Sequence, residues 1–89
     1  MGELQEKVAI VTGASSGIGR ATVELFGREK AVVVAADVID DAGQGLADEL
    51  ARLGQTCTFV HADVSKESDV AAMVELALSQ YGRLDVRTG

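Results

Sequence analysis

Three glycines near the N-terminus, Gly13, Gly17 and Gly19, follow the spacing Gly-x-x-x-Gly-x-Gly between an apolar run and an amphipathic segment. A turn of this kind lets backbone amides and the positive end of a helix dipole face an anion at close range. In a dinucleotide site, Gly13 would make the sharp turn, Gly17 would let a pyrophosphate approach, and Gly19 would let the helix pack closely. No Gly-Lys-Ser/Thr follows, so the stretch is not a P-loop. The pattern predicts a nucleotide site, and the alternative is a purely structural glycine turn.

A carboxylate, Asp37, follows the second apolar run of the chain. It could accept hydrogen bonds from the hydroxyl pair of a ribose, and its charge would repel a 2′-phosphate. The neighbouring residues Ser16 and Val38 are neutral, so no cation is evident to hold that phosphate. We therefore expect NAD in preference to NADP. The alternative is a solvated carboxylate in the acidic run of Asp37, Asp40 and Asp41.

Two hydrophobic periodicities alternate along the chain, and the elements they predict must position these residues. Continuous apolar or β-branched runs predict buried strands, over residues 8–11, 31–36 and 56–60, with the start of a fourth strand at 84–86. Apolar stripes at helical spacing predict helices, across residues 18–26, 46–53 and 70–81. Ser65 is the expected N-cap of the third helix, and Gly54 and Gly82 are the expected helix ends.

The order β-α-β-α-β-α-β predicts an α/β fold with a parallel sheet, because crossovers between parallel strands are right-handed. We expect two helices on one face of the sheet, one helix on the other, and an incomplete fourth strand. The uncovered sheet would then be open to self-association or to pairing with another chain.

Composition excludes several classes of protein. The chain has 8 basic and 14 acidic residues, a net charge of −6, and no basic run longer than one residue, which argues against nucleic-acid and anionic-membrane partners. No apolar run approaches a membrane span, and the polar N-terminus does not resemble a signal peptide. The single cysteine, Cys57, cannot form an internal disulfide. A cytoplasmic location is the simplest expectation.

The segment "TGASSGIG", Thr12 to Gly19, resembles the cofactor loop of the short-chain dehydrogenase/reductase family, and "HADVS" and "YGRLDV" resemble two later segments of that family. The resemblance spans nearly the whole chain and implies the N-terminal half of a Rossmann-like dinucleotide-binding domain over residues 1–89. It also implies that Asp63 bonds the adenine amino group and that Val64 lines the adenine pocket. The residues expected to contact the cofactor are Gly13, Ser15, Ser16, Gly17, Ile18, Gly19, Asp37, Asp63 and Val64.

Two departures from the family pattern stand out. Lys30 occupies a position between the first helix and the second strand that is normally glycine. After Val86 the chain reads "RTG", where the family continues with apolar residues and Asn-Asn-Ala-Gly. The resemblance places the catalytic Ser, the Tyr-x-x-x-Lys pair and a structural Asn of the family after this point, and the chain lacks them. Its single tyrosine, Tyr81, is followed four positions later by Asp85 and not by Lys.

No residue of this chain is therefore expected to be catalytic, and no metal-ligand cluster is evident. We expect Tyr81 and Cys57 to pack in the core and His61 to be structural or exposed. Three hypotheses stay open: an interrupted copy of an NAD-dependent oxidoreductase that acts on an alcohol or ketone, inactive as this chain; a non-catalytic adenine-nucleotide-binding module; and an inert gene remnant.

Overall fold

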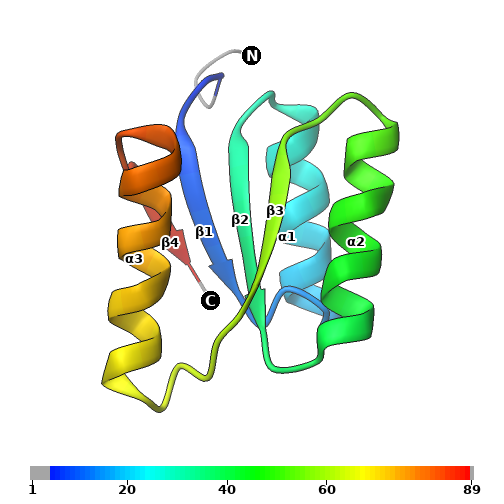
Figure 1. Cartoon of the computed structure of the whole chain (residues 1–89). Coiled ribbons are helices and arrows are strands. Elements are labelled where there is room, and N and C mark those ends of the chain that lie inside the picture. The colour runs from blue at the N-terminus through cyan, green and yellow to red at the C-terminus, as the bar shows by residue number, and fades with distance from the viewer. Residues whose placement is uncertain (1–4, 89) are drawn as a thin grey trace.

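The computed structural model describes residues 5–88, so residues 1–4 and 89 of the predicted domain lie outside the described residues. Strands and helices alternate throughout, as the periodicities predicted (Figure 1). The strands are β1 (Val8–Thr12), β2 (Val32–Asp37), β3 (Cys57–His61) and β4 (Val86–Thr88). The helices are α1 (Gly17–Arg28), α2 (Asp40–Arg52) and α3 (Glu67–Tyr81).

The four strands form one parallel sheet in the order β3-β2-β1-β4. The central pair β1 and β2 runs in register from Val8 opposite Val32 to Thr12 opposite Ala36. Both strands are apolar along almost their whole length and are buried on both faces, which is typical of a parallel sheet covered by crossover helices. The predicted α/β, Rossmann-like arrangement is confirmed.

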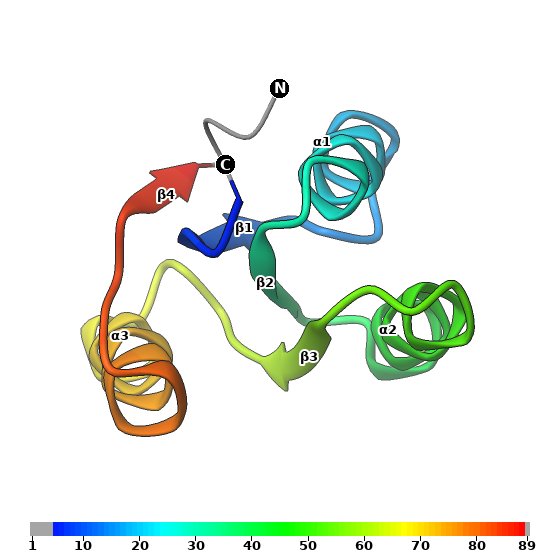
Figure 2. The same ribbon diagram turned by 90° about the horizontal axis from the view of Figure 1, so that it is seen from above.

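The helices lie in two layers. Figure 2 shows α1 and α2 together on one face of the sheet and α3 alone on the other, as predicted. The core is accordingly double. Ile10 and Val34 pack toward α3 with Met73, whereas Val33 and Leu50 belong to the core beneath α1 and α2.

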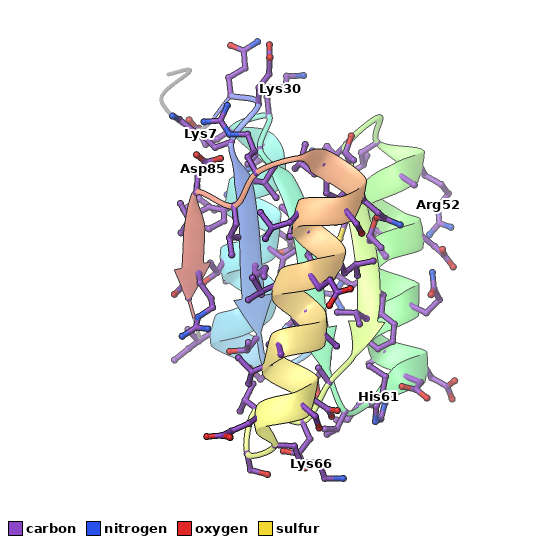
Figure 3. The ribbon with its side chains drawn as sticks, turned by 60° about the vertical axis from the view of Figure 1, so that its left-hand side comes forward. Lys7, Lys30, Arg52, His61, Lys66 and Asp85 are labelled. Atoms are coloured by element: carbon purple, nitrogen blue, oxygen red, sulfur yellow. The ribbon has the colours of Figure 1, made fainter. Side chains whose placement is uncertain are left out.

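All strands run the same way, so their carboxyl ends and the N-termini of the three helices share one edge of the sheet, the lower edge in Figure 1. Figure 3 places Lys7, Lys30 and Asp85 at the opposite edge, whereas His61 and Lys66 lie near the carboxyl ends. Two of the chain's few cations are therefore remote from the glycine turn.

Three predicted boundaries were wrong. Helix α2 begins at Asp40 and not near residue 46. The fourth strand is Val86–Thr88, so Arg87 and Thr88 continue it beside β1. Ser65 is not the N-cap of α3, because its amide and hydroxyl both donate to Asp63, and Lys66 takes the cap position without a side-chain hydrogen bond. The local Asx-type turn therefore uses the hydroxyl that would otherwise have capped the helix.

Gly43 lies in α2 at a close approach to β3. A β carbon on Gly43 would overlap the ring of Phe59. The glycine therefore reflects helix–sheet packing, and it does not prevent α2 from beginning at Asp40. From the sequence alone, the start of this helix is poorly defined because Gly43 and Gly45 both lower helix propensity.

Two helices end in the same hydrogen-bonded turn, but with different residues at the left-handed position. After α2, Gly54 has φ +78° and Gln55 N–H donates to Leu50 O at 3.0 Å. After α1, Lys30 has φ 67° and Ala31 N–H donates to Phe26 O at 3.0 Å. This is the Schellman arrangement, in which glycine is the usual residue.

Lys30→Gly is expected to raise the free energy of unfolding by about 0.5–1 kcal/mol, since relief of left-handed strain exceeds the added entropy of the unfolded chain. Urea denaturation measures the change. The reciprocal variant Gly54→Ala meets no atom within 4 Å of its new β carbon, so it isolates backbone strain and should lower stability by about 1 kcal/mol. Lys30→Ala keeps a β carbon and should gain nothing. If Lys30→Gly and Lys30→Ala were equally stable, the left-handed conformation of residue 30 would not be a source of strain.

Candidate functional site

The turn between β1 and α1 is held by its own hydrogen bonds. Gly13 has φ 62° and its carbonyl accepts from the Ser16 amide at 3.0 Å and from Ser16 Oγ at 2.7 Å. Ser16 is the N-cap of α1, and its Oγ accepts from the Gly19 amide at 3.4 Å. Gly13 thus makes the sharp turn off the strand, as its place in the sequence predicted.

Gly19 and Gly17 have different surroundings. A β carbon on Gly19 would overlap the carbonyl group of Gly13 and lie 3.1 Å from Ala14 Cα. Gly17 is exposed, and a β carbon there would meet nothing within 4 Å. Gly19 therefore permits the helix to pack on the turn, whereas nothing inside the described chain requires Gly17 to be glycine.

The N-terminus of α1 differs electrostatically from those of the other helices. Its first turn contains no acidic residue, whereas α2 begins with Asp40 and Asp41 and α3 has Glu67 and Asp69 in its first turn. Among residues 5–88, the amides of Gly17 and Ile18 have no hydrogen-bond acceptor. The positive end of the α1 dipole is thus left uncompensated in a chain of net charge −6.

A cleft of about 340 Å³ opens in front of this helix end. It brings together five of the residues predicted to contact a cofactor, namely Gly13, Ser16, Ile18, Gly19 and Val64. Ile18 and Val64 are 85% and 58% exposed and form apolar surface at the cleft. Four other predicted residues do not line it but lie at the same carboxyl edge of the sheet, namely Ser15, Gly17, Asp37 and Asp63.

Four residues of the cleft wall were not predicted from the sequence, namely Val11, Thr12, Thr22 and Thr88. Thr12 precedes Gly13 directly, and Thr22 lies one turn after Ile18, to whose carbonyl it donates at 2.9 Å. Their positions next to predicted site residues could have identified both. Thr88 comes from β4, and its carbonyl accepts from Thr12 Oγ1 at 3.4 Å. Only the pairing of β4 with β1 brings it to the cleft.

Asp37 ends β2 and is 9% exposed, so the alternative of a solvated carboxylate is wrong. Its Oδ2 accepts from the Ser15 amide at 3.0 Å and from Ser15 Oγ at 2.6 Å. Its Oδ1 accepts from the amides of Val38 and Ile39 at 2.7 and 3.2 Å. Burial raises the pKa of Asp37, but the hydrogen bonds from Ser15, Ile39 and Val38 outweigh it and hold the pKa below its ordinary value. The carboxylate is therefore ionised at neutral pH.

Asp63 follows β3 and is also paired with a serine. Its Oδ1 accepts from the Ser65 amide at 2.9 Å and from Ser65 Oγ at 2.7 Å. These bonds, with a smaller contribution from Lys66, hold the pKa of Asp63 below its ordinary value. The backbone amide of Asp63 donates to Asp69 Oδ2 at 2.9 Å, which ties the loop to the first turn of α3.

The other side chains that could take part in chemistry make structural contacts instead. The Tyr81 hydroxyl lies 2.6 Å from Thr58 Oγ1, and the ring packs on the core beneath α3. His61 is exposed, and its Nδ1 lies 2.6 Å from Asp40 Oδ1. Burial raises the pKa of the Cys57 thiol to about 11, so the thiol is protonated at neutral pH. Its side chain is partly buried and packs against the core beneath α1 and α2.

No group of three or more His, Cys, Asp or Glu side chains among residues 5–88 is placed to hold a metal ion. Within the same residues, no helix has the length and apolar character needed to cross a membrane.

Comparison with known proteins gives a consistent result. The family model for short chain dehydrogenase matches residues 7–87. Tropinone reductase-like 1 of Erythroxylum coca is 52% identical over 83 residues, which are 93% of this chain and 29% of that protein. (+)-Borneol dehydrogenase 1 of Salvia officinalis is 46% identical over 83 residues, which are 93% of this chain and 31% of that protein. The chain thus spans about 30% of the length of such relatives.

Solved structures agree with the sequence relatives. One is a short chain dehydrogenase/reductase from Burkholderia phymatum in complex with NAD, which superposes with a TM-score of 0.93 at 36% identity. The match covers 98% of this chain and 31% of that protein's chain. A hydroxysteroid dehydrogenase from Escherichia coli gives a TM-score of 0.91 at 32% identity, over 97% of this chain and 37% of its own.

Proposed function

Because the chain belongs to the short-chain dehydrogenase family, we propose that it binds the adenosine and pyrophosphate of NAD at the carboxyl edge of its sheet. The N-terminus of α1 carries this proposal, since it is the helix end whose first turn lacks acidic residues and contributes Ile18 and Gly19 to the wall of the cleft. Two negatively charged phosphates would be stabilised there by the free amides and the helix dipole.

The residues present fit such a ligand. The close contact of Gly19 with the Gly13 carbonyl brings the start of the helix against the turn. Gly17 leaves open space in front of the helix amides. In this proposal Gly13, Ser16, Gly17, Ile18 and Gly19 surround the pyrophosphate.

Asp37 supports NAD over NADP. The carboxylate is ionised, and the two residues after it, Val38 and Ile39, are apolar. A ribose hydroxyl can donate to such a carboxylate, whereas a 2′-phosphate would be repelled.

Asp63 and Val64 would hold the adenine. Among the described residues, Asp63 Oδ2 accepts no hydrogen bond, so it can accept one from an amino group. Val64, 58% exposed, offers apolar surface for a base.

When bound, NAD can accept a hydride from an alcohol, or NADH can supply one to a ketone. The whole-protein activity that we propose is this exchange, with residues 5–88 binding the cofactor and supplying no acid or base. Tyr81 is bonded to Thr58 and packed on the core, which supports this division. The second candidate function is a nucleotide-binding module without catalysis. The hydrogen bond between Tyr81 and Thr58 favours this function for residues 5–88 by themselves, because it leaves the tyrosine in a structural role.

Thermal denaturation with NAD and NADP tests the proposal. At 100-fold excess over Kd, NAD should add about 2.7 kcal/mol of stability, a melting shift of roughly 10–20 °C for a domain of this size. NADP should give a smaller shift at equal concentration. Inorganic phosphate at matched ionic strength is the control for non-specific anion effects. No shift with NAD at millimolar concentration would overturn the nucleotide site, and equal shifts with both would overturn the NAD preference alone.

A further inference from the structure

The Asp37 carboxylate has no acceptor position left free. A carboxylate has about four lone-pair positions, and four donors occupy those of Asp37. Two are the amide and hydroxyl of Ser15 on Oδ2, at 3.0 and 2.6 Å. The others are the amides of Val38 and Ile39 on Oδ1, at 2.7 and 3.2 Å. A ribose hydroxyl can bond this carboxylate well only if one present donor leaves.

The four donors differ in their freedom to leave. Three are backbone amides, whose positions are set by the turn after β1 and the turn after β2. The fourth is Ser15 Oγ, which needs only a rotation about χ1. Ser15 is half-buried, so its hydroxyl could reach water after that rotation. The Ser15 hydroxyl is therefore the donor that a ribose would displace.

Asp63 offers a contrast within the same chain. Ser65 also donates both its amide and its hydroxyl, but both bonds go to one oxygen, Oδ1. Among the described residues nothing donates to Asp63 Oδ2, so Asp63 can accept a ligand hydrogen bond without losing one.

We propose that Ser15 sets the affinity for the ribose by occupying the acceptor position on Asp37 that a ribose hydroxyl takes in the complex. This inference rests on the proposed function. It makes Ser15 a positioning residue, which holds the carboxylate in the free protein and is exchanged on binding. The exchange replaces one hydrogen bond to Asp37 with another, so the ribose hydroxyls add little net affinity in the natural sequence.

Removing the Ser15 hydroxyl should reveal the exchange. In Ser15→Ala the acceptor is already free, and a ribose hydroxyl gains a bond without displacing one. Adenosine diphosphate is the appropriate probe, since it carries the adenine, ribose and pyrophosphate. We expect it to bind Ser15→Ala about 3- to 10-fold more tightly than the natural chain, the typical worth of one net hydrogen bond.

The matched probe is 2′,3′-dideoxyadenosine diphosphate, which lacks both ribose hydroxyls. Its affinity should be the same for the natural chain and Ser15→Ala. The control variant is Ser79→Ala, which removes an exposed hydroxyl bonded to Leu76 O in α3 and should change neither affinity. Isothermal titration calorimetry of both probes against the three proteins gives all six constants.

The natural chain provides a readout that does not depend on any variant. There, adenosine diphosphate should bind less than about 3-fold more tightly than the dideoxy probe, because the ribose only exchanges donors and gains no net hydrogen bond. A larger ratio would overturn the inference, as would unchanged or weaker binding of adenosine diphosphate to a folded Ser15→Ala. If neither probe nor NAD binds any of the proteins, the proposed function itself fails. Binding with the wrong dependence on Ser15 refutes the exchange alone.

Discussion

Gly19→Ala is expected to lower the free energy of unfolding by about 3 kcal/mol or more, the upper range for overpacking. The new β carbon would overlap the carbonyl group of Gly13 and approach Ala14 Cα to 3.1 Å. These are backbone atoms, so no side-chain rotation can relieve the contact. Either the turn after β1 or the start of α1 must move. Both carry the proposed pyrophosphate site, so NAD binding should be lost as well.

Gly17→Ala is the matched control, two residues away in the same helix. Its β carbon meets nothing within 4 Å, so stability should change by no more than about 1 kcal/mol, in the stabilising direction. Binding of NAD should nevertheless weaken, because the methyl group enters the space proposed for the pyrophosphate. Urea denaturation and NAD titration of both variants separate packing from binding. Equal stability losses in the two variants would contradict the packing role of Gly19.

Asp37→Asn is expected to cost about 2 kcal/mol of stability, the penalty for leaving buried donors unsatisfied. Asparagine keeps one acceptor oxygen, but its amide group would face either the donors of Ser15 or the amides of Val38 and Ile39. The preference for NAD over NADP should also shrink, because the charge that repels the 2′-phosphate is gone. The control is Asp48→Asn, which removes the same charge at an exposed position of α2 where the carboxylate accepts from Gln44. It should leave the stability and the preference for NAD nearly unchanged.

The free energy of unfolding should depend on pH through the ionisation of the Asp37 carboxylate. Folding lowers the pKa of Asp37 from its ordinary value of 3.8, so the ionised group stabilises the native state above that value. This stabilisation is lost as the pH falls below it, toward the lower pKa of the folded protein. The difference in unfolding free energy between the natural chain and Asp37→Asn should therefore narrow below about pH 4. A difference that stays constant from pH 7 to pH 3 would show that the ionised carboxylate is not the stabilising form.

The order of strands, helices and turns along this chain depends on local sequence patterns, and the sequence by itself determined it. Apolar runs and helical stripes alternate because each strand is buried on both faces and each helix on one. Turn geometry followed in the same way, since Gly13, Gly54 and Gly82 all have the positive φ that their positions require. The right-handed crossover then placed two helices on one face and one on the other without reference to any particular contact.

Side-chain partnerships were decided only by the tertiary structure. Asp37 meets Ser15 across 22 positions of sequence, and Thr58 meets Tyr81 across 23. Thr88 reaches the cleft because β4 pairs with β1. Ser65 has the local features of a helix cap, yet its hydroxyl binds Asp63 instead. Hydrogen-bond partners depend on which strand ends meet at the edge of the sheet and on which acceptor is nearest in space. Periodicity carries no information about either, so the glycine turn was recognisable from the sequence while the occupied state of its neighbouring carboxylate was not.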